Sequence, residues 1–186
     1  MGETPRRKRD SRETYKSSKT SSNIKKTKEK IKKLFEKKEA VKCSEILSTL
    51  CLSPHFIGCF AQNSLEISIT YPCYMIVNID SKGDPGSHWL ALKVDDESLE
   101  IFDPLGFEIF NWKSVPCQLL EFIHHHSKHK QVLISPRIQS DLSEICALYC
   151  CFFIFYRNFN SFQTLCSLFS ETLSENDTRL KLLLDV

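Results

Sequence analysis

Short apolar runs bounded by turn-forming residues occupy the middle of the chain. Three of them are rich in aliphatic and aromatic residues: CYMIVNI at 73–79, HWLALKV at 88–94 and LEIFD at 99–103. Runs of this length and composition, separated by Gly, Asp, Pro or acidic residues, predict β-strands. We expect them to follow one another as a meander in one sheet. A fourth run, QVLIS at 131–135, predicts another strand.

Helices are predicted on both sides of these strands. The patterns favour helices at about 43–51, 116–126, 145–158 and 161–174, of which the third is apolar enough to be buried. Residues 23–39 repeat apolar side chains among lysines, which predicts a helix with a narrow apolar stripe formed by Ile24, Ile31, Leu34 and Phe35. Together these elements predict an α+β fold with a meandering sheet.

The net charge of +2 hides a division of the chain into a basic and an acidic part. Residues 1–40 carry 15 Lys and Arg against 6 Asp and Glu, whereas residues 41–186 carry 10 against 17. We therefore expect a basic N-terminal extension, residues 1–40, ahead of one domain, residues 41–186. The first 22 residues have almost nothing to bury, so we expect them to be disordered and the helix at 23–39 to follow.

The extension leaves several functions open. Its stretch RRKRDSR at 6–12 is typical of a nuclear localisation signal or a nucleic-acid-binding patch, but it equally fits a tail that only aids solubility. The lysine-rich helix at 23–39 could lie on DNA phosphates, on an acidic membrane surface or against the acidic body of the protein.

Composition narrows the class of protein further. The nine cysteines are odd in number and irregularly spaced, and no apolar signal segment follows Met1, so we expect reduced thiols in a cytosolic or nuclear protein. The longest apolar segment, 145–156, is shorter than the ~20 residues that a membrane-spanning helix needs. The five glycines form no phosphate-binding loop, so nothing favours ATP chemistry.

Cys146 lies where the buried helix is predicted to begin, in SEICALYCCFF. A nucleophilic cysteine must be a thiolate, and a free thiol with a pKa of about 8.5 is mostly protonated at neutral pH. A helix N-terminus favours the thiolate, and Ser143 and Glu144 are suitable N-cap or first-turn residues. Cys150 and Cys151 lie one turn deeper and are better explained as small core residues.

Three further residues complete a candidate catalytic group. His88 opens a predicted strand and Asp103 ends the next one, so antiparallel pairing would bring the two side chains together at one edge of the sheet. Gln139 precedes Cys146 by seven residues, where its amide and the Cys146 N–H could face an oxyanion. Each residue alone also has a purely structural explanation, and only their combination favours catalysis.

A second cluster, HHHSKH at 124–129, is a weaker candidate site. His125 and His129 have a spacing that would allow metal binding if the segment were helical. Because no cysteine or carboxylate has matching spacing, the cluster is better explained as the polar end of a helix. We expect no metal and no cofactor to be required for the chemistry.

The order and local sequence of the four candidate residues resemble the adenovirus cysteine protease family. This family also occurs in Maverick or Polinton-type DNA elements and is distantly related to SUMO-specific proteases. Five motifs of the family have counterparts in this chain. In the family they are a His-Trp pair, an acidic residue in Phe-Glu-Pro-Phe-Gly, a glutamine, the segment Cys-Gly-Leu-Phe-Cys-Cys and the run Gly-Pro-Tyr-Phe-Leu-Gly. Their counterparts are His88-Trp89, Phe102-Asp103-Pro104-Leu105-Gly106, Gln139, Cys146-Ala147-Leu148-Tyr149-Cys150-Cys151 and Ser53-Pro54-His55-Phe56-Ile57-Gly58. The resemblance spans about residues 43–170.

The resemblance implies a papain-like, adenovirus-protease-type α+β fold with a central mixed sheet flanked by helices. It also implies a cysteine endopeptidase encoded by a DNA virus or a virus-like transposable element. Cys146 would be the nucleophile, with His88 as its base. Asp103 would orient His88, and Gln139 would belong to the oxyanion hole.

The family's biology implies substrates and partners as well. Substrates would be capsid and core precursor proteins, cleaved after small residues near glycines, in the host nucleus and the virion, or in the nucleus or cytoplasm for an element-encoded enzyme. Activation by DNA or by a viral peptide is implied, and DNA would bind the basic residues 1–38 because the body is acidic. We expect a monomer without a membrane partner.

The sequence departs from the family pattern at three points. Asp103 stands where the adenovirus enzymes have Glu, as in the SUMO-protease relatives. Ala147 stands where the family has Gly, so its methyl group could crowd the substrate or demand an unusual φ. Residues 128–139 lack the cysteine that bonds the activating peptide. Two alternatives remain open: a SUMO- or ubiquitin-like-protein isopeptidase, and a non-catalytic DNA-binding or scaffold protein that retains the fold.

Overall fold

A five-stranded mixed sheet forms the centre of the protein. The computed structural model describes residues 10–37, 40–84, 86–107 and 115–185. The strands lie in the order β1-β2-β3-β4-β5, with bounds Phe56–Ala61, Cys73–Asn78, Trp89–Val94, Ser98–Phe102 and Gln131–Ile134. Strands β2, β3 and β4 form the predicted antiparallel meander, and the parallel strands β1 and β5 lie at the two edges. The sequence pattern does not predict β1, because Gly58 interrupts its apolar run where the pairing register shifts.

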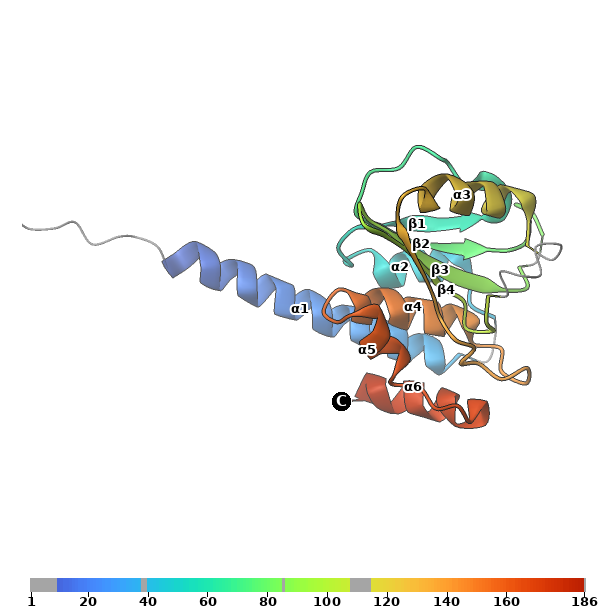
Figure 1. The fold of residues 1–186 in the computed structure, drawn as a ribbon. Coiled ribbons are helices and arrows are strands. Elements are labelled where there is room, and N and C mark those ends of the chain that lie inside the picture. The colour runs from blue at the N-terminus through green and yellow to red at the C-terminus, as the bar shows by residue number, and fades with distance from the viewer. Residues whose placement is uncertain (1–9, 38–39, 85, 108–114, 186) are drawn as a thin grey trace, which may run out of the picture.

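Alternate residues of the sheet enter two apolar cores, one on each face. On β2, Tyr74 and Ile76 pack with one core, whereas Met75 and Val77 pack with the other. Figure 1 shows α3 covering one face of the sheet and α1, α2 and α4 lying on the other. These helices span Asp10–Phe35 (α1), Cys43–Leu50 (α2), Cys117–Ser127 (α3) and Cys146–Arg157 (α4). The predicted α+β class and the predicted helices near 43–51, 116–126 and 145–158 are therefore confirmed.

Helix α4 is the central element of the larger core. Its first nine residues are all buried, because the sheet lies on one side of the helix and other helices lie on the other side. Phe153 stacks on Phe102 of β4 with ring centroids 4.7 Å apart. No helix in the described ranges is long and apolar enough to cross a bilayer.

Helix α1 is longer than predicted and belongs to the core. It begins at Asp10, so the prediction of disorder is wrong for residues 10–22, while residues 1–9 and 38–39 lie outside the described residues. Ile31 and Leu34 are buried in the same core as α4, as the predicted apolar stripe requires. Once this packed part is helical, each added residue gains a backbone hydrogen bond, which favours extension towards the N-terminus. Of the three locations considered for this helix, the structure shows packing against the body.

The C-terminal part differs from the prediction of one helix at 161–174. Helix α5 spans only Phe162–Cys166, the 3₁₀ turn η2 covers Leu173–Glu175, and a further helix, α6, spans Asn176–Asp185. The buried Asn176 side chain bonds both the N–H and the C=O of Ser170, which holds the chain in a turn between the two helices.

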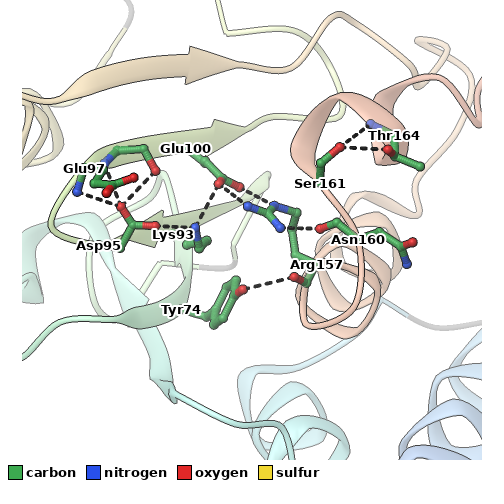
Figure 2. Close-up of polar contacts among 10 residues, drawn as sticks. Tyr74, Lys93, Asp95, Glu97, Glu100, Arg157, Asn160, Ser161 and Thr164 are labelled. Carbon is green, nitrogen blue, oxygen red and sulfur yellow. Dashed lines mark hydrogen bonds and ion pairs between the residues drawn. The ribbon is translucent and has the colours of Figure 1, made fainter.

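A buried ion cluster fixes the C-terminal end of α4 to the sheet. The Glu100 carboxylate, 1% exposed, accepts from Arg157 Nε at 2.7 Å and from Lys93 Nζ at 3.0 Å, as Figure 2 shows. Lys93 and Arg157 lie near the C-terminal ends of β3 and α4. His88 and Cys146 lie at the N-terminal ends of the same two elements. The cluster therefore sets how α4 lies along β3, and with it how the two candidate catalytic residues meet.

Candidate active site

His88 and Asp103 meet at one edge of the sheet, as predicted. His88 directly precedes β3 and Asp103 directly follows β4, and these strands are antiparallel neighbours. The His88 Nε2 and Asp103 Oδ1 atoms are 2.6 Å apart, and the two residues are 8% and 7% exposed. This short, shielded hydrogen bond leaves Nδ1 as the His88 nitrogen that can serve a second partner.

The loop before His88 has a constrained shape. Gly86 adopts a φ of 83°, and a Cβ at this position would lie 2.6 Å from Asn78 Nδ2. The Asp80 carboxylate accepts hydrogen bonds from both the backbone N–H and the hydroxyl of Ser87. A glycine is therefore required here, and the loop presents His88 at a fixed point of the sheet edge.

Asp103 is held in place by neighbours that sequence reasoning did not identify. The Leu105 N–H donates to Asp103 Oδ1 at 3.0 Å, so this oxygen accepts from the backbone as well as from His88. The buried Ser135 hydroxyl both accepts from the Asp103 N–H and donates to the Asp103 carbonyl, each at 3.0 Å. These bonds leave the carboxylate little freedom to rotate away from the imidazole. Because Ser135 lies 32 residues from Asp103 in the sequence, no local sequence pattern predicts this contact.

Cys146 is the first residue of α4. Its backbone N–H belongs to the first turn, whose donors have no carbonyl one turn earlier in the helix, and the helix dipole there favours an anion. The N-cap is Ile145, and the predicted capping role of Ser143 and Glu144 is wrong, because both precede the cap and no side chain caps this helix. The uncapped helix start faces the cavity described below.

His88 and Cys146 line the same cavity. Burial alone would lower the pKa of His88, but its hydrogen bond with Asp103 and the proximity of Cys146 raise that pKa to about 9. The structure therefore brings His88, Asp103 and Cys146 together in the order that acid–base activation of a thiol requires.

Gln139 lies in the same site and is almost completely buried, at 1% exposed. The Pro104 carbonyl accepts from the backbone N–H groups of Ile138 and Gln139, and the Asn176 amide donates to the Ile138 carbonyl at 2.8 Å. Gln139 Nε2 donates one hydrogen to the Ser143 carbonyl at 2.6 Å, which leaves its second N–H for another acceptor. Asn176 lies outside the segment of the resemblance, so only the fold reveals that α6 supports this loop.

A cavity of about 290 Å³ connects these residues. Its lining includes His88, Gln139 and Cys146, together with Trp89, Ser143 and Ala147. Ala147 lies inside α4 and outside the positive-φ region, which non-glycine residues of the described chain adopt only at His55 and His129. Ala147 therefore does not need an unusual φ, and the residue forms part of the cavity wall.

Ala40 and Val41 also line this cavity, although the sequence predicts a boundary between them, with the extension ending at residue 40 and the domain beginning at residue 41. The connection between α1 and α2 thus contributes to the site.

The other cysteines near the site behave as core residues. Cys150 and Cys151 are fully buried, and burial raises the pKa of both thiols, that of Cys151 to about 12. Their prediction as small core residues is confirmed.

The histidine cluster does not form the helical metal pair considered above. Helix α3 ends at Ser127, and His129 has a φ of 61°, so His125 and His129 are not one helical turn apart. His126 is buried, its Nδ1 lies 2.6 Å from the Tyr71 hydroxyl, and burial lowers its pKa to about 4. Among the described residues, no three His, Cys, Asp or Glu side chains form a group that could hold a metal ion.

The fold and site together define an α+β protein that holds a histidine–aspartate pair against a cysteine at a helix N-terminus. No protein-family model matches the chain, and no curated protein matches its sequence.

Proposed function

We propose that the protein is a cysteine endopeptidase with a papain-like, adenovirus-protease-type arrangement of its site. The observation that carries the proposal is the meeting of His88 Nε2 with Asp103 Oδ1 at 2.6 Å while His88 and Cys146 line the same cavity. Residues that are 58 positions apart in the sequence thereby form a nucleophile, a base and an orienting carboxylate. His88 and Asp103 lie at one edge of the sheet, and Cys146 lies at the start of α4.

The chemistry follows from these positions. The Cys146 sulfur attacks the scissile carbonyl carbon, the C–S bond forms, and the carbonyl oxygen becomes an oxyanion. The Cys146 N–H and the free N–H of Gln139 are the donors for that oxyanion. The oxyanion then collapses and the C–N bond breaks as His88 gives its proton to the leaving amine. Water loses a proton to the neutral imidazole and adds to the acyl carbon, and the C–S bond breaks to release the acid and the Cys146 thiol. Asp103 keeps the ring oriented in both steps.

The sequence resemblance extends the proposal to substrate and location. The substrates would be capsid and core precursor proteins of a DNA virus or virus-like element, cleaved after small residues near glycines. The enzyme would act in the host nucleus and the virion. The small size of the cavity and its walls of Ala40, Trp89 and Ala147 favour a substrate with little side-chain bulk at the scissile bond.

DNA is the proposed activating partner, and the basic extension is its proposed binding surface. Lys25, Lys26 and Lys33 are exposed on α1, away from the stripe that packs against the body. Removal of all residues 1–38 would also remove Ile31 and Leu34 from the core. Substitution of the exposed lysines is therefore the cleaner test of DNA binding.

The proposed activity predicts that Cys146→Ala and His88→Ala abolish peptide cleavage while the fold is retained. The assay exposes the purified protein to a mixed library of peptides and identifies new termini by mass spectrometry. Cys150→Ala, a change of the same size one turn along α4, is the matched control and should keep the activity. Cleavage that persists in both purified site variants would refute the assignment. A reaction of Cys146 only with SUMO- or ubiquitin-based probes would instead indicate an isopeptidase.

A further inference from the structure

Two polar atoms in the catalytic cavity have no partner. Gln139 Oε1 and Ser143 Oγ are both buried and make no hydrogen bond with any residue that the structure describes. Both residues line the cavity that contains Cys146. A buried polar atom without a partner costs free energy, so such atoms call for an explanation.

The position of Ser143 excludes the usual structural role of such a serine. A serine shortly before a helix normally caps its N-terminus, but α4 begins with Ile145 as its N-cap and has no side-chain cap. The backbone of Ser143 is in contrast fully used, because its carbonyl accepts from Gln139 and its N–H donates to the Ser140 carbonyl. The loop is therefore fixed through its backbone, and the hydroxyl is left for a ligand.

The two free atoms have complementary chemistry. The Ser143 hydroxyl can donate a hydrogen bond, and Gln139 Oε1 can only accept one. In an extended peptide the N–H and C=O of one residue point to the same side, as they do in a hydrogen-bonded pair of an antiparallel sheet. The Ser143 hydroxyl and Gln139 Oε1 can therefore pair with the C=O and the N–H of one substrate residue, whatever the side chain of that residue is.

We propose that Ser143 and Gln139 bind the substrate residue that precedes the scissile bond through its main chain. The Ser143 hydroxyl donates to the carbonyl oxygen that becomes the oxyanion, as a third donor beside the Cys146 N–H and the Gln139 amide. Gln139 Oε1 accepts from the N–H of the same substrate residue. This inference rests on the proposed peptidase function and adds Ser143 to its catalytic residues.

A peptide aldehyde, acetyl-glycyl-glycinal, tests the inference directly. Its aldehyde carbon adds the Cys146 sulfur, the C=O π bond breaks, and the oxygen, which takes up a proton or stays an oxyanion, occupies the position of the oxyanion. Iodoacetamide alkylates the same sulfur and forms no oxyanion, so its rate reports only the state of the thiol. The inhibition constant of the aldehyde is measured as protection of Cys146 from iodoacetamide, followed by mass spectrometry.

Ser143→Ala should raise the inhibition constant of the aldehyde roughly tenfold to 100-fold, the range for loss of one hydrogen bond to a charged oxygen. Its iodoacetamide rate without aldehyde should be unchanged and its melting temperature should not fall, because the buried hydroxyl has no partner to lose among the described residues. Ser143→Thr keeps a hydroxyl and should retain most of the affinity. Ser140→Ala, the same change in the same loop outside the cavity lining, should have no effect. N-methylation of the terminal residue of the aldehyde should weaken binding to the wild-type protein.

The outcomes separate this inference from the proposed function. An unchanged inhibition constant in Ser143→Ala, with normal protection of the wild type, would overturn the role of Ser143 and leave the peptidase assignment intact. A lowered melting temperature with unchanged aldehyde affinity would show a structural role instead. If neither reagent reacts with Cys146 in the wild type, both the peptidase assignment and this inference fail.

Discussion

The titration of His88 is the sharpest physical consequence of the site. His88 has a pKa of about 9 instead of 6.5, although its burial acts in the opposite direction. At ~1.4 kcal/mol per pKa unit, a shift of this size corresponds to roughly 3 kcal/mol in favour of the imidazolium. Asp103 and Cys146 are the source of this stabilisation.

The sign of the effect on stability follows from the raised pKa. Because the folded protein binds the His88 proton more tightly than the unfolded chain, the stabilisation is fully present below pH 6.5. It is lost as the pH rises from there through about 9. Asp103→Asn removes the charge that offsets burial, so the pKa of His88 should fall, and the decrease in stability over this window should flatten.

Nuclear magnetic resonance of the histidine ring protons measures this pKa directly, and His88→Gln identifies the signal among the six histidines. Urea unfolding between pH 6 and 10 measures the stability change in parallel. The matched control is Asp96→Asn, which neutralises an exposed aspartate away from the site and should leave the His88 titration unchanged. A wild-type His88 that titrates at or below 6.5 in the folded protein would refute the proposed contacts with Asp103 and Cys146.

Two further predictions concern the supports of the site. Glu100→Ala leaves the partly buried Arg157 guanidinium without its carboxylate and should lower the free energy of unfolding by about 3 kcal/mol, measured with urea; a change below 1 kcal/mol would contradict the structural role of the cluster. Replacement of Lys25, Lys26 and Lys33 by Gln should weaken binding to duplex DNA and reduce the slope of log K against log salt by up to about 3, while a circular dichroism melt stays unchanged. An unaltered slope would exclude this face of α1 as the DNA-binding surface.

Elements with a strong local pattern were predictable from the sequence. The three central strands, the strand at 131–134 and the buried helix of Cys146 all occur close to their predicted positions, because each combines an apolar run with clear turn residues. The edge strand β1 and the helix α6 were not predicted. Gly58 interrupts the apolar pattern of β1. The start of α6 at Asn176 depends on the hydrogen bond between the Asn176 side chain and Ser170, which no local pattern indicates.

The candidate site shows the same division. The sequence by itself determined the identities and order of His88, Asp103, Gln139 and Cys146, because residue types and their spacing are written in the chain. Only the tertiary structure decided that His88 and Asp103 share a 2.6 Å hydrogen bond, because that distance depends on the register of β3 with β4.

The surroundings of the site were also decided by the fold alone. Ser135 on Asp103, Asn176 beside Gln139, and the free hydroxyl of Ser143 all depend on contacts between distant or non-periodic segments. The sequence shows which donors and acceptors the chain contains, but packing determines how they pair. A shift of one ångström changes which hydrogen bonds are made.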